Sequence, residues 1–210
     1  MTDFIPLFPL NLVVFPGEGL NLHIFEPQYR QLIREAEENR ITFGIPAVID
    51  GKMMDYGTEV KLERVAKRYK GGELDVKTLG VGLFKITKFY KTVPNKLYGG
   101  ADIERIELGK SHDKSLNITI LGLVTQLFTA LKIKKAIPKS NEPFTLYDLA
   151  HHVGFSIEQE YKFLCIDNME ERQDYMIDHL ENLIPVVKEM ERLRKRVQLN
   201  GHFKEERPEI

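Results

Sequence analysis

The order of apolar and polar positions predicts a strand followed directly by a helix near the start of the chain. Between residues 20 and 25, leucine and isoleucine alternate with polar or aromatic residues, which is typical of a strand with one buried face. Glu26-Pro27 then starts a helix, because proline is favoured at the first helical position. The helix carries one apolar stripe, formed by Tyr29, Leu32, Ile33 and Ala36. Asn39 is expected to end it.

Further short apolar segments, separated by turn residues, favour a small barrel or sandwich over a parallel sheet. Turns are expected at Asp50-Gly51 and at Lys70-Gly71-Gly72-Glu73. Gly80 and Gly82 flank Val81 and predict a bulge or a sharp bend. The expected strands are Asn11–Phe15, Leu20–Phe25, Thr42–Ile49, Glu59–Tyr69, Leu74–Gly80, Phe84–Tyr90 and Asp102–Glu107.

The pattern becomes helical after about residue 110, and the polar segment Leu108–Ser115 is interpreted as a domain boundary. We therefore expect a strand-rich domain over 1–110, a helical subdomain over 115–200 and a polar tail over 201–210. Pro185 lies inside the last helix without breaking the phase of its apolar stripe, which favours a kinked helix. The expected helices are Leu116–Ile133, Thr145–Val153, Ser156–Cys165 and a longer one from near Asp167.

That apolar stripe has two interpretations. Its residues are Met176, Leu180, Leu183, Val187, Met190 and Val197. They could dock a partner or form a homodimer. Packing within the chain's own helices is the simpler use and is favoured.

Composition and charge narrow the class of protein. The 210 residues are 42% hydrophobic and 29% charged, which is ordinary for a globular protein. The net charge of -1 provides no global basic field for nucleic acid or membrane. The single cysteine, Cys165, excludes an intramolecular disulfide, and no apolar run approaches the ~20 residues of a membrane helix. We expect a cytoplasmic protein without a membrane partner.

Several motifs, taken in order, resemble the N-terminal, substrate-binding domain of the Lon protease family. They are Pro9-Leu10, Phe15-Pro16-Gly17, the segment LHIFEPQYR from Leu22 to Arg30, Phe43-Gly44-Ile45, Gly57-Thr58 as a turn, and GLFKI from Gly82 to Ile86. The resemblance covers about residues 4–108, and Glu171-Arg172-Gln173 is similar to the start of the long helix in the same family.

This resemblance implies an α+β fold and a function. The fold would be a PUA-like pseudo-barrel of about six mostly antiparallel strands with one helix, followed by a helical bundle with a long last helix. The function would be recognition of unfolded or extended protein segments, as an adaptor or regulator for a protease or chaperone complex. Complete Lon proteins add an ATPase and a Ser-Lys protease, so we interpret this chain as the recognition part standing alone.

The residues of the chain do not provide the chemistry of those enzymes. A phosphate-binding loop needs a glycine five residues before its Gly-Lys dipeptide. Gly51-Lys52 and Gly109-Lys110 both lack it, and the residue five positions before Gly109 is Glu104. The candidate serine nucleophiles lie in polar segments or at helix starts, and a serine needs an activating base to act as a nucleophile. They are Ser111, Ser115, Ser140 and Ser156. His151 and His152 point about 100° apart on a helix and do not converge on a metal. We expect no catalytic, cofactor-binding or metal-binding residues.

One polar cluster, formed by His23, Glu26, Tyr29 and Arg30, has both a functional and a structural interpretation. It could be a binding or acid-base site at a strand-helix junction. The structural interpretation is favoured, because Glu26 lies at the helix start and four residues before Arg30.

Two binding functions remain as alternatives. In the first, an open barrel takes an extended peptide by strand addition, with Tyr56, Tyr69 and Tyr98 as candidate contacts. In the second, the barrel binds RNA through the basic stretches 61–70, 132–135 and 192–196. Interspersed glutamates dilute these stretches, so nucleic acid is disfavoured as a partner.

Overall fold

The computed structural model describes residues 3–107, 114–138 and 144–202, with side chains up to residue 198. Its contacts divide the chain into two units, which are Met1–Lys110 with Thr145–Asn168 and Ser111–Phe144 with Met169–Ile210. We call them the barrel unit and the helical unit. The sequence-based division had grouped 145–168 with the helices instead. The predicted boundary at 108–115 lies mostly outside the described residues.

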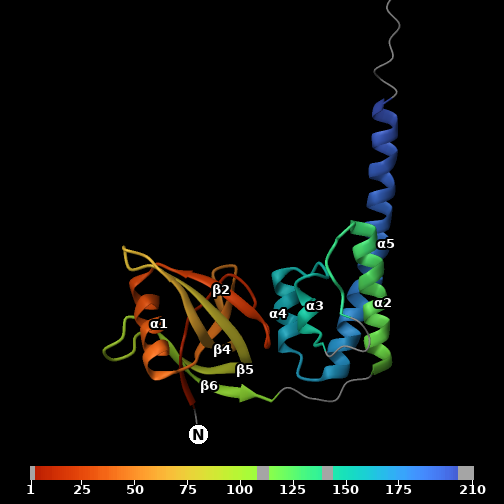
Figure 1. Ribbon diagram of the computed structural model, residues 1–210. Coiled ribbons are helices and arrows are strands. Elements are labelled where there is room, and N and C mark those ends of the chain that lie inside the picture. Colours follow the sequence, from red (N-terminus) through yellow and green to blue (C-terminus); the bar gives the residue numbers. More distant parts are fainter. Residues whose placement is uncertain (1–2, 108–113, 139–143, 203–210) are drawn as a thin grey trace, which may run out of the picture. The chain divides into compact units, whose positions relative to one another are not determined.

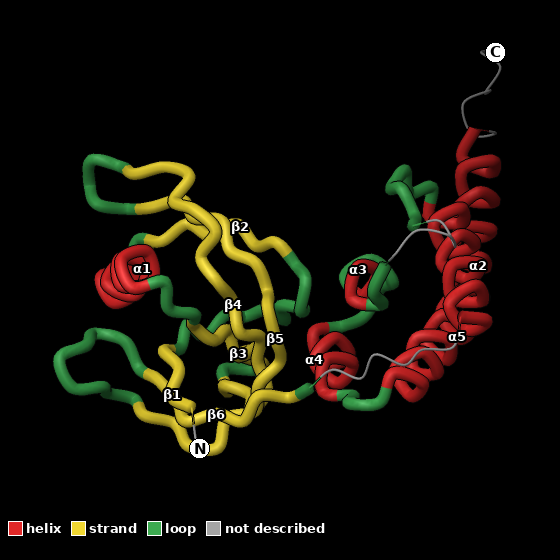
Figure 2. Tube along the Cα trace, turned by 60° about the horizontal axis from the view of Figure 1, so that its bottom comes forward, coloured by secondary structure: helices red, strands yellow, loops and turns green. Residues whose placement is uncertain are grey.

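The strands of the barrel unit form one six-stranded, antiparallel sheet, and the helix of residues 27–39 packs against it (Figures 1 and 2). The strands are β1 (Asp3–Pro6), β2 (Gly19–Ile24), β3 (Phe43–Ile49), β4 (Lys52–Arg68), β5 (Leu74–Tyr90) and β6 (Gly100–Ile106). They pair in the order β1-β6-β5-β4-β3, and β2 pairs with β5. The predicted six-stranded, mostly antiparallel architecture is confirmed.

The sheet closes into a barrel through the segment that follows β1. Leu7 and Leu10 form parallel bridges to Gly44 and Ala47 of β3. Backbone hydrogen bonds accompany them, including Phe8 N to Gly44 O at 2.8 Å. This segment therefore connects the two ends of the strand order. The predicted strand Asn11–Phe15 is wrong, because the residues that pair with β3 precede it. Residues 11–15 contain no strand, and three consecutive residues there, Val13, Val14 and Phe15, are all buried.

β5 is one continuous strand where the sequence predicted two. The predicted bulge is present, because the β4–β5 register passes from Glu59–Gly82 to Val60–Gly80 and leaves Val81 as the extra residue. Val81 is 46% exposed, as expected for a residue pushed out of the ladder.

The predicted turn at Gly57-Thr58 is wrong, because both residues lie within β4. A Cβ atom on Gly57 would lie 2.7 Å from both the Ile45 carbonyl oxygen and the Phe84 ring. Glycine is needed there because the strand and the ring approach each other closely. The Asp50-Gly51 turn is confirmed, with positive φ at both residues.

Helix α1 (Pro27–Asn39) forms as the sequence predicts. Pro27 occupies the first helical position and Glu26 the N-cap position, with extended backbone angles. Leu32, Ile33 and Ala36 are buried in the core cluster that also contains Ile24 of β2 and Val76 of β5. The helix therefore covers one face of the β2–β5–β4 sheet with these residues and presents its other face to solvent (Figure 1).

A half-buried polar group connects three strands of the barrel. Arg105 of β6 donates from Nε to Glu59 Oε2 of β4 at 2.7 Å, and it also pairs with Asp3 of β1. Thr42 donates to the other Glu59 oxygen at 2.5 Å. The hydrogen bond from Arg105 holds the pKa of Glu59 below its usual value, and burial opposes this shift. Glu59 is therefore charged and fully engaged although it is only 7% exposed.

The helices that follow divide between the two units. α3 (Tyr147–Ala150) and α4 (Ile157–Cys165) belong to the barrel unit, and α2 (Lys114–Leu131) and α5 (Met169–His202) form the helical unit. The helix predicted to begin at Ser156 is confirmed, and reciprocal bonds between Ser156 and Gln159 form a capping box at its start. α5 runs through Pro185 as one helix, as the phase of its stripe predicted.

Within the helical unit, only part of the predicted α5 stripe is buried. Met176, Leu180 and Val187 are buried, whereas Met190 and Val197 are 64% and 72% exposed. Gln173 is fully buried and donates to Asn117 of α2 at 2.7 Å. The two helices therefore pack along the first half of α5.

Candidate functional site

An open groove with a volume of about 710 Å³ lies beside α1. We call it the α1 groove. α1, the tip of the β4–β5 hairpin and the loop of residues 91–99 contribute its lining. The lining residues are Pro27, Arg30, Gln31, Arg34, Arg68, Tyr69, Gly72, Leu74, Asn95 and Leu97.

The 91–99 loop is fixed to α1 by a set of polar contacts. Glu35 Oε2 accepts from Lys96 Nζ at 2.6 Å and from the Tyr98 hydroxyl at 2.5 Å. Leu97 N donates to Gln31 Oε1 at 2.9 Å. Burial alone would raise the pKa of Glu35, but the bonds from Lys96 and Tyr98 outweigh it and lower the pKa. The wall of the groove is therefore held by a charged carboxylate.

Arg30 is held in the groove by the hairpin tip. Its Nη1 donates to the Gly71 carbonyl at 3.0 Å. Gly72 has φ +92°, and a Cβ atom there would collide with the Arg30 guanidinium. Glycine at position 72 thus allows both the left-handed backbone and the close approach of Arg30.

A second cation of the groove, Arg68, crosses from β4 to α1. Its Nη2 contacts both carboxylate oxygens of Glu37, at 2.6 and 2.7 Å. Glu37 lines a neighbouring hollow between the end of α1 and residues 61–65 of β4. Arg68 lines the α1 groove and Glu37 lines the neighbouring hollow, so their ion pair joins the linings of the two.

Tyr69 is the one predicted contact tyrosine that lines the groove, and it is 37% exposed. Its hydroxyl donates to Asp75 Oδ2 at 2.7 Å, and His23 contacts the other oxygen of Asp75 at 2.7 Å. Lys67 Nζ lies 4.3 Å from the centre of its ring, and the His23 ring packs edge-on at 5.6 Å. The ring is therefore fixed in place by its neighbours.

The other two predicted contact tyrosines lie elsewhere. Tyr98 is 3% exposed and bonded to Glu35, so its ring is part of the core and is not an accessible contact. Tyr56 lies on β4, where its backbone N–H donates to the Tyr161 hydroxyl of α4 at 3.2 Å and Lys85 lies over its ring. Neither residue lines the α1 groove.

The predicted cluster of His23, Glu26, Tyr29 and Arg30 is dispersed among different partners. His23 contacts Asp75, Glu26 accepts from Gln28 at 2.6 Å, and Arg30 contacts Gly71. Tyr29 stacks on Phe8 with ring centres 4.0 Å apart. The expected Glu26–Arg30 pair does not form among the described residues, because Arg30 reaches the hairpin tip instead. Only Arg30 of the four lines the groove.

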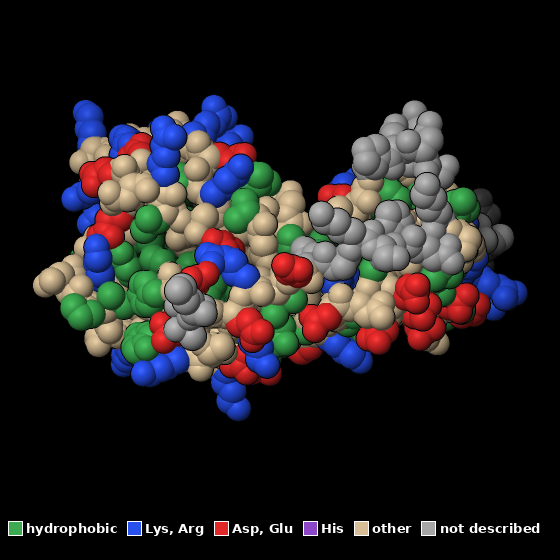
Figure 3. Space-filling model, turned by 90° about the horizontal axis from the view of Figure 1, so that it is seen from below, with side chains coloured by type: hydrophobic (Ala, Val, Ile, Leu, Met, Phe, Trp, Pro, Cys, Tyr) green, Lys and Arg blue, Asp and Glu red, His purple; other side chains and the backbone are tan. Residues whose placement is uncertain are grey.

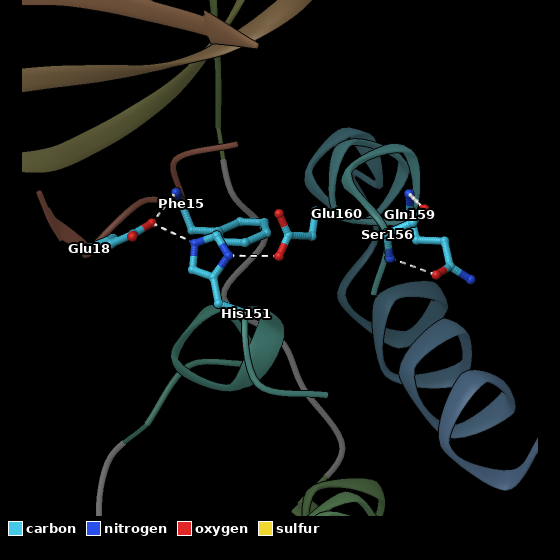
Figure 4. A network of polar contacts seen from close by, with 6 residues as sticks. All are labelled: Phe15, Glu18, His151, Ser156, Gln159 and Glu160. Carbon is cyan, nitrogen blue, oxygen red and sulfur yellow. Dashed lines mark hydrogen bonds and ion pairs between the residues drawn. The ribbon is translucent and has the colours of Figure 1, made fainter. Parts of the chain in front are cut away.

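A second polar arrangement joins α3 and α4 to the loop before β2 (Figure 4). His151 Nε2 lies 3.1 Å from Glu18 Oε2, and His151 Nδ1 lies 2.7 Å from Glu160 Oε1. Glu18 also accepts from Phe15 N at 2.9 Å. Phe15 is fully buried and stacks on Tyr147 with ring centres 5.1 Å apart.

The two carboxylates raise the pKa of His151 to about 9, with Glu160 contributing most and Glu18 next. His151 is therefore a cation at neutral pH and connects two acids. A charged imidazole in this position cannot accept a proton, so it is unsuited to act as a general base. We interpret this cluster as a structural connection between the barrel and its two short helices.

A metal site, a serine nucleophile and a membrane helix each place their own requirements on the described residues. Among them, no group of three or more histidine, cysteine and acidic side chains could hold a metal ion. The Ser156 hydroxyl is engaged at the start of α4, where it contacts Gln159 N and Glu158. No helix within the described ranges is both long and apolar enough to span a membrane.

Sequence reasoning missed Arg34, Arg68 and Leu97 as groove residues. One signal was present for the first of them: Arg30 and Arg34 are spaced i, i+4, which places two like charges side by side on α1. Such a pair destabilises an isolated helix by about 0.2–0.5 kcal/mol. A local feature that opposes folding is a sign of function. The roles of Arg68 and Leu97 depend on the hairpin and loop, which the local pattern does not place.

Comparison with solved structures confirms the class of fold. A Lon N-terminal domain protein from Xanthomonas campestris is 21% identical with a TM-score of 0.66, and 84% of this chain aligns with 98% of that chain. The N-terminal domain of the Mycobacterium avium complex Lon protease is 16% identical with a TM-score of 0.67, and 85% of this chain aligns with 98% of that chain. No curated protein matches the chain.

The sequence itself carries the family assignment. Residues 5–182 match the family model of the ATP-dependent protease La (LON) substrate-binding domain. The chain therefore belongs to this family, as its motifs predicted. The match extends past the barrel strands and includes α2, α3, α4 and the first part of α5.

Proposed function

We propose that this protein is a non-catalytic module that binds extended protein segments in the α1 groove, as an adaptor or regulator in protein quality control. The observation that carries the proposal is the groove itself, an open hollow of about 710 Å³ whose walls are held by Glu35 and Gly71. Membership of a substrate-binding family supports it. A pre-formed groove with mixed apolar and polar walls suits a peptide.

Side-chain binding in the groove is favoured over strand addition at the nearby edge of β4. Beyond Val60, that edge pairs with no other described strand on its outer side. Its ladder with β5 shifts register after Leu62 and again after Val65. The same stretch carries Lys61, Arg64 and Lys67. Irregular register and basic side chains are features by which sheets keep an edge from pairing with another chain.

An array of peptides covering the sequence of an unfolded model protein tests the proposal. We expect micromolar binding of a subset of peptides by the wild-type protein. Leu97→Glu should weaken binding of that subset, because Leu97 is 67% exposed in the groove. Val81→Glu is the matched control, because Val81 is exposed but does not line the groove. No binding across the array, or equal loss in both variants, would contradict the proposal.

The absence of catalysis is tested separately. Purified protein incubated with casein, with and without ATP, should leave the substrate intact over hours. Fragments that accumulate with time and disappear when the protein is omitted would show that the protein is an enzyme.

A pull-down that recovers a protease or chaperone would support the adaptor role.

A further inference from the structure

We propose that the α1 groove selects segments in which carboxylate side chains alternate with apolar ones. This inference rests on the proposed function and names the chemistry of its ligand. The ten lining residues include three arginines and no aspartate or glutamate, although the whole chain has a net charge of -1. The positive charge is therefore a local property of the groove. On the face shown in Figure 3, Lys and Arg side chains are interspersed with acidic ones.

Among the described residues, two of the three arginines have no acidic partner. Arg68 is matched by Glu37 through two contacts. Arg30 is held by a neutral carbonyl oxygen, and neither Arg30 nor Arg34 forms an ion pair with a carboxylate of the described residues. A guanidinium has five N–H donors, so Arg30 keeps donors for a ligand after its bond to Gly71.

The spacing of Arg30 and Arg34 favours an external anion between them. The two side chains are neighbours on α1 because they are four residues apart. Their mutual repulsion would be relieved by a carboxylate that contacts both. Guanidinium groups suit this role because their planar forks match carboxylate geometry. The Arg68–Glu37 pair shows that geometry at the edge of the same groove.

The remaining lining favours a ligand that is also apolar. Leu97 is exposed, Leu74 is buried with 8% of its surface accessible, and Pro27 lies at the start of α1. These residues would contact aliphatic side chains between the ligand's carboxylates. In an extended segment with this alternation, the carboxylates lie on one side and the apolar side chains on the other. A twist of the segment would let the carboxylates reach the arginines while the apolar side chains reach the apolar lining.

A single-stranded nucleic acid also carries negative charge, but it fits the groove less well. Such ligands bind by stacking their bases on accessible aromatic faces. Tyr69 is the single aromatic among the lining residues described, and Lys67 lies over its ring while His23 packs edge-on against it. The groove therefore offers charge and aliphatic surface without a free stacking platform.

The test compares three ten-residue probes by fluorescence anisotropy, each with an uncharged label. One alternates leucine with glutamate, the second replaces each glutamate by glutamine, and the third is oligouridine. We expect the glutamate peptide to bind about tenfold more tightly than the glutamine peptide, as two partly exposed ion pairs would give. Raising the salt from 0.05 to 0.5 M should remove most of this advantage.

Two variants connect the result to the groove. The double variant Arg30→Gln/Arg34→Gln should lose the preference for glutamate and retain the affinity for the glutamine peptide. Arg196→Gln removes one exposed arginine of α5 that does not line the groove, and it should retain the preference. Matching circular dichroism melting curves would establish that the variants are folded.

The outcomes separate this inference from the proposed function. Equal binding of both peptides, lost in Leu97→Glu, would overturn the acidic preference and leave the peptide-binding function standing. A preference that survives in the double variant would place the acidic site elsewhere and overturn the inference. Tighter binding of oligouridine, lost in the double variant, would overturn it in favour of nucleic acid. No binding of either peptide would overturn the inference, whereas the proposed function would be contradicted only if the peptide array also showed no binding.

Discussion

His151 and Glu18, 133 positions apart in the sequence, lie 3.1 Å from each other between Nε2 and Oε2. This contact connects α3 to the loop before β2, and the contact of His151 with Glu160 extends the connection to α4. The barrel unit therefore includes two helices that follow the strands by forty or more residues.

The protonation of His151 is the first prediction. Its raised pKa of about 9 should appear in a histidine NMR titration as a late transition, against an ordinary His near 6.5. Glu160→Gln should lower this pKa more than Glu18→Gln, because Glu160 contributes more to the shift. A His151 transition below pH 7 in the wild-type protein would contradict the assigned ion pairs.

The same shift predicts how the attachment of α3 and α4 depends on pH. A group whose pKa is raised by folding stabilises the folded state fully below its unfolded pKa, and this contribution is lost as pH rises through the folded value. We therefore expect the protection of α3 and α4 amides from hydrogen exchange, corrected for intrinsic rates, to fall between about pH 6.5 and about 9. His151→Gln should remove this pH dependence, and α1 amides provide the internal control.

Phe15 should be the apolar centre of this attachment. It is fully buried, stacks on Tyr147 and packs edge-on against Phe163 at 6.1 Å. Phe15→Ala should destabilise the barrel unit by about 3–5 kcal/mol. Trypsin should then cleave after Lys162 of α4 faster than in the wild-type protein. Phe25→Ala is the control, because Phe25 is 62% exposed, and equal cleavage in both variants would argue against this role.

Glu35 is expected to hold the 91–99 loop, which forms one wall of the α1 groove, against α1. Replacing it with glutamine removes the charge that holds Lys96 and Tyr98, and bonds to charged groups contribute about 1.5–3 kcal/mol each. Trypsin cleavage after Lys96 should accelerate about tenfold or more, whereas cleavage after the exposed Lys91 should change little. Because the pKa of Glu35 is lowered, the loop should also loosen as pH falls below about 4, measured by hydrogen exchange.

Barrel closure at Glu59 gives a further prediction. Glu59→Gln weakens the contacts from Arg105 at 2.7 and 3.1 Å, and it should destabilise the barrel unit by about 1–3 kcal/mol. The measurement is the denaturation midpoint followed by circular dichroism. Glu104→Gln, an exposed change on β6 next to Arg105, should leave the midpoint nearly unchanged. Equal midpoints for the two variants would show that the Arg105 contact does not stabilise closure.

The sequence by itself determined the local elements and the family. Pro27 at the helix start, the alternation in β2 and the Ser156 capping box are local signals, because they depend on residues within a few positions of each other. For the same reason the Asp50-Gly51 turn and the bulge at Val81 were predictable. The motif order identified the Lon substrate-binding family, which the match over residues 5–182 confirms.

Only the tertiary structure decided the closure of the barrel and the composition of the α1 groove. Gly57 looked like a turn residue, but it serves a close approach between a strand and Phe84. Arg30 looked like a partner for Glu26, but the hairpin tip provides Gly71. Tyr98 was a candidate surface contact and is core, whereas Leu97 beside it is exposed. Each of these outcomes depends on contacts between segments far apart in the chain, which local periodicity does not contain.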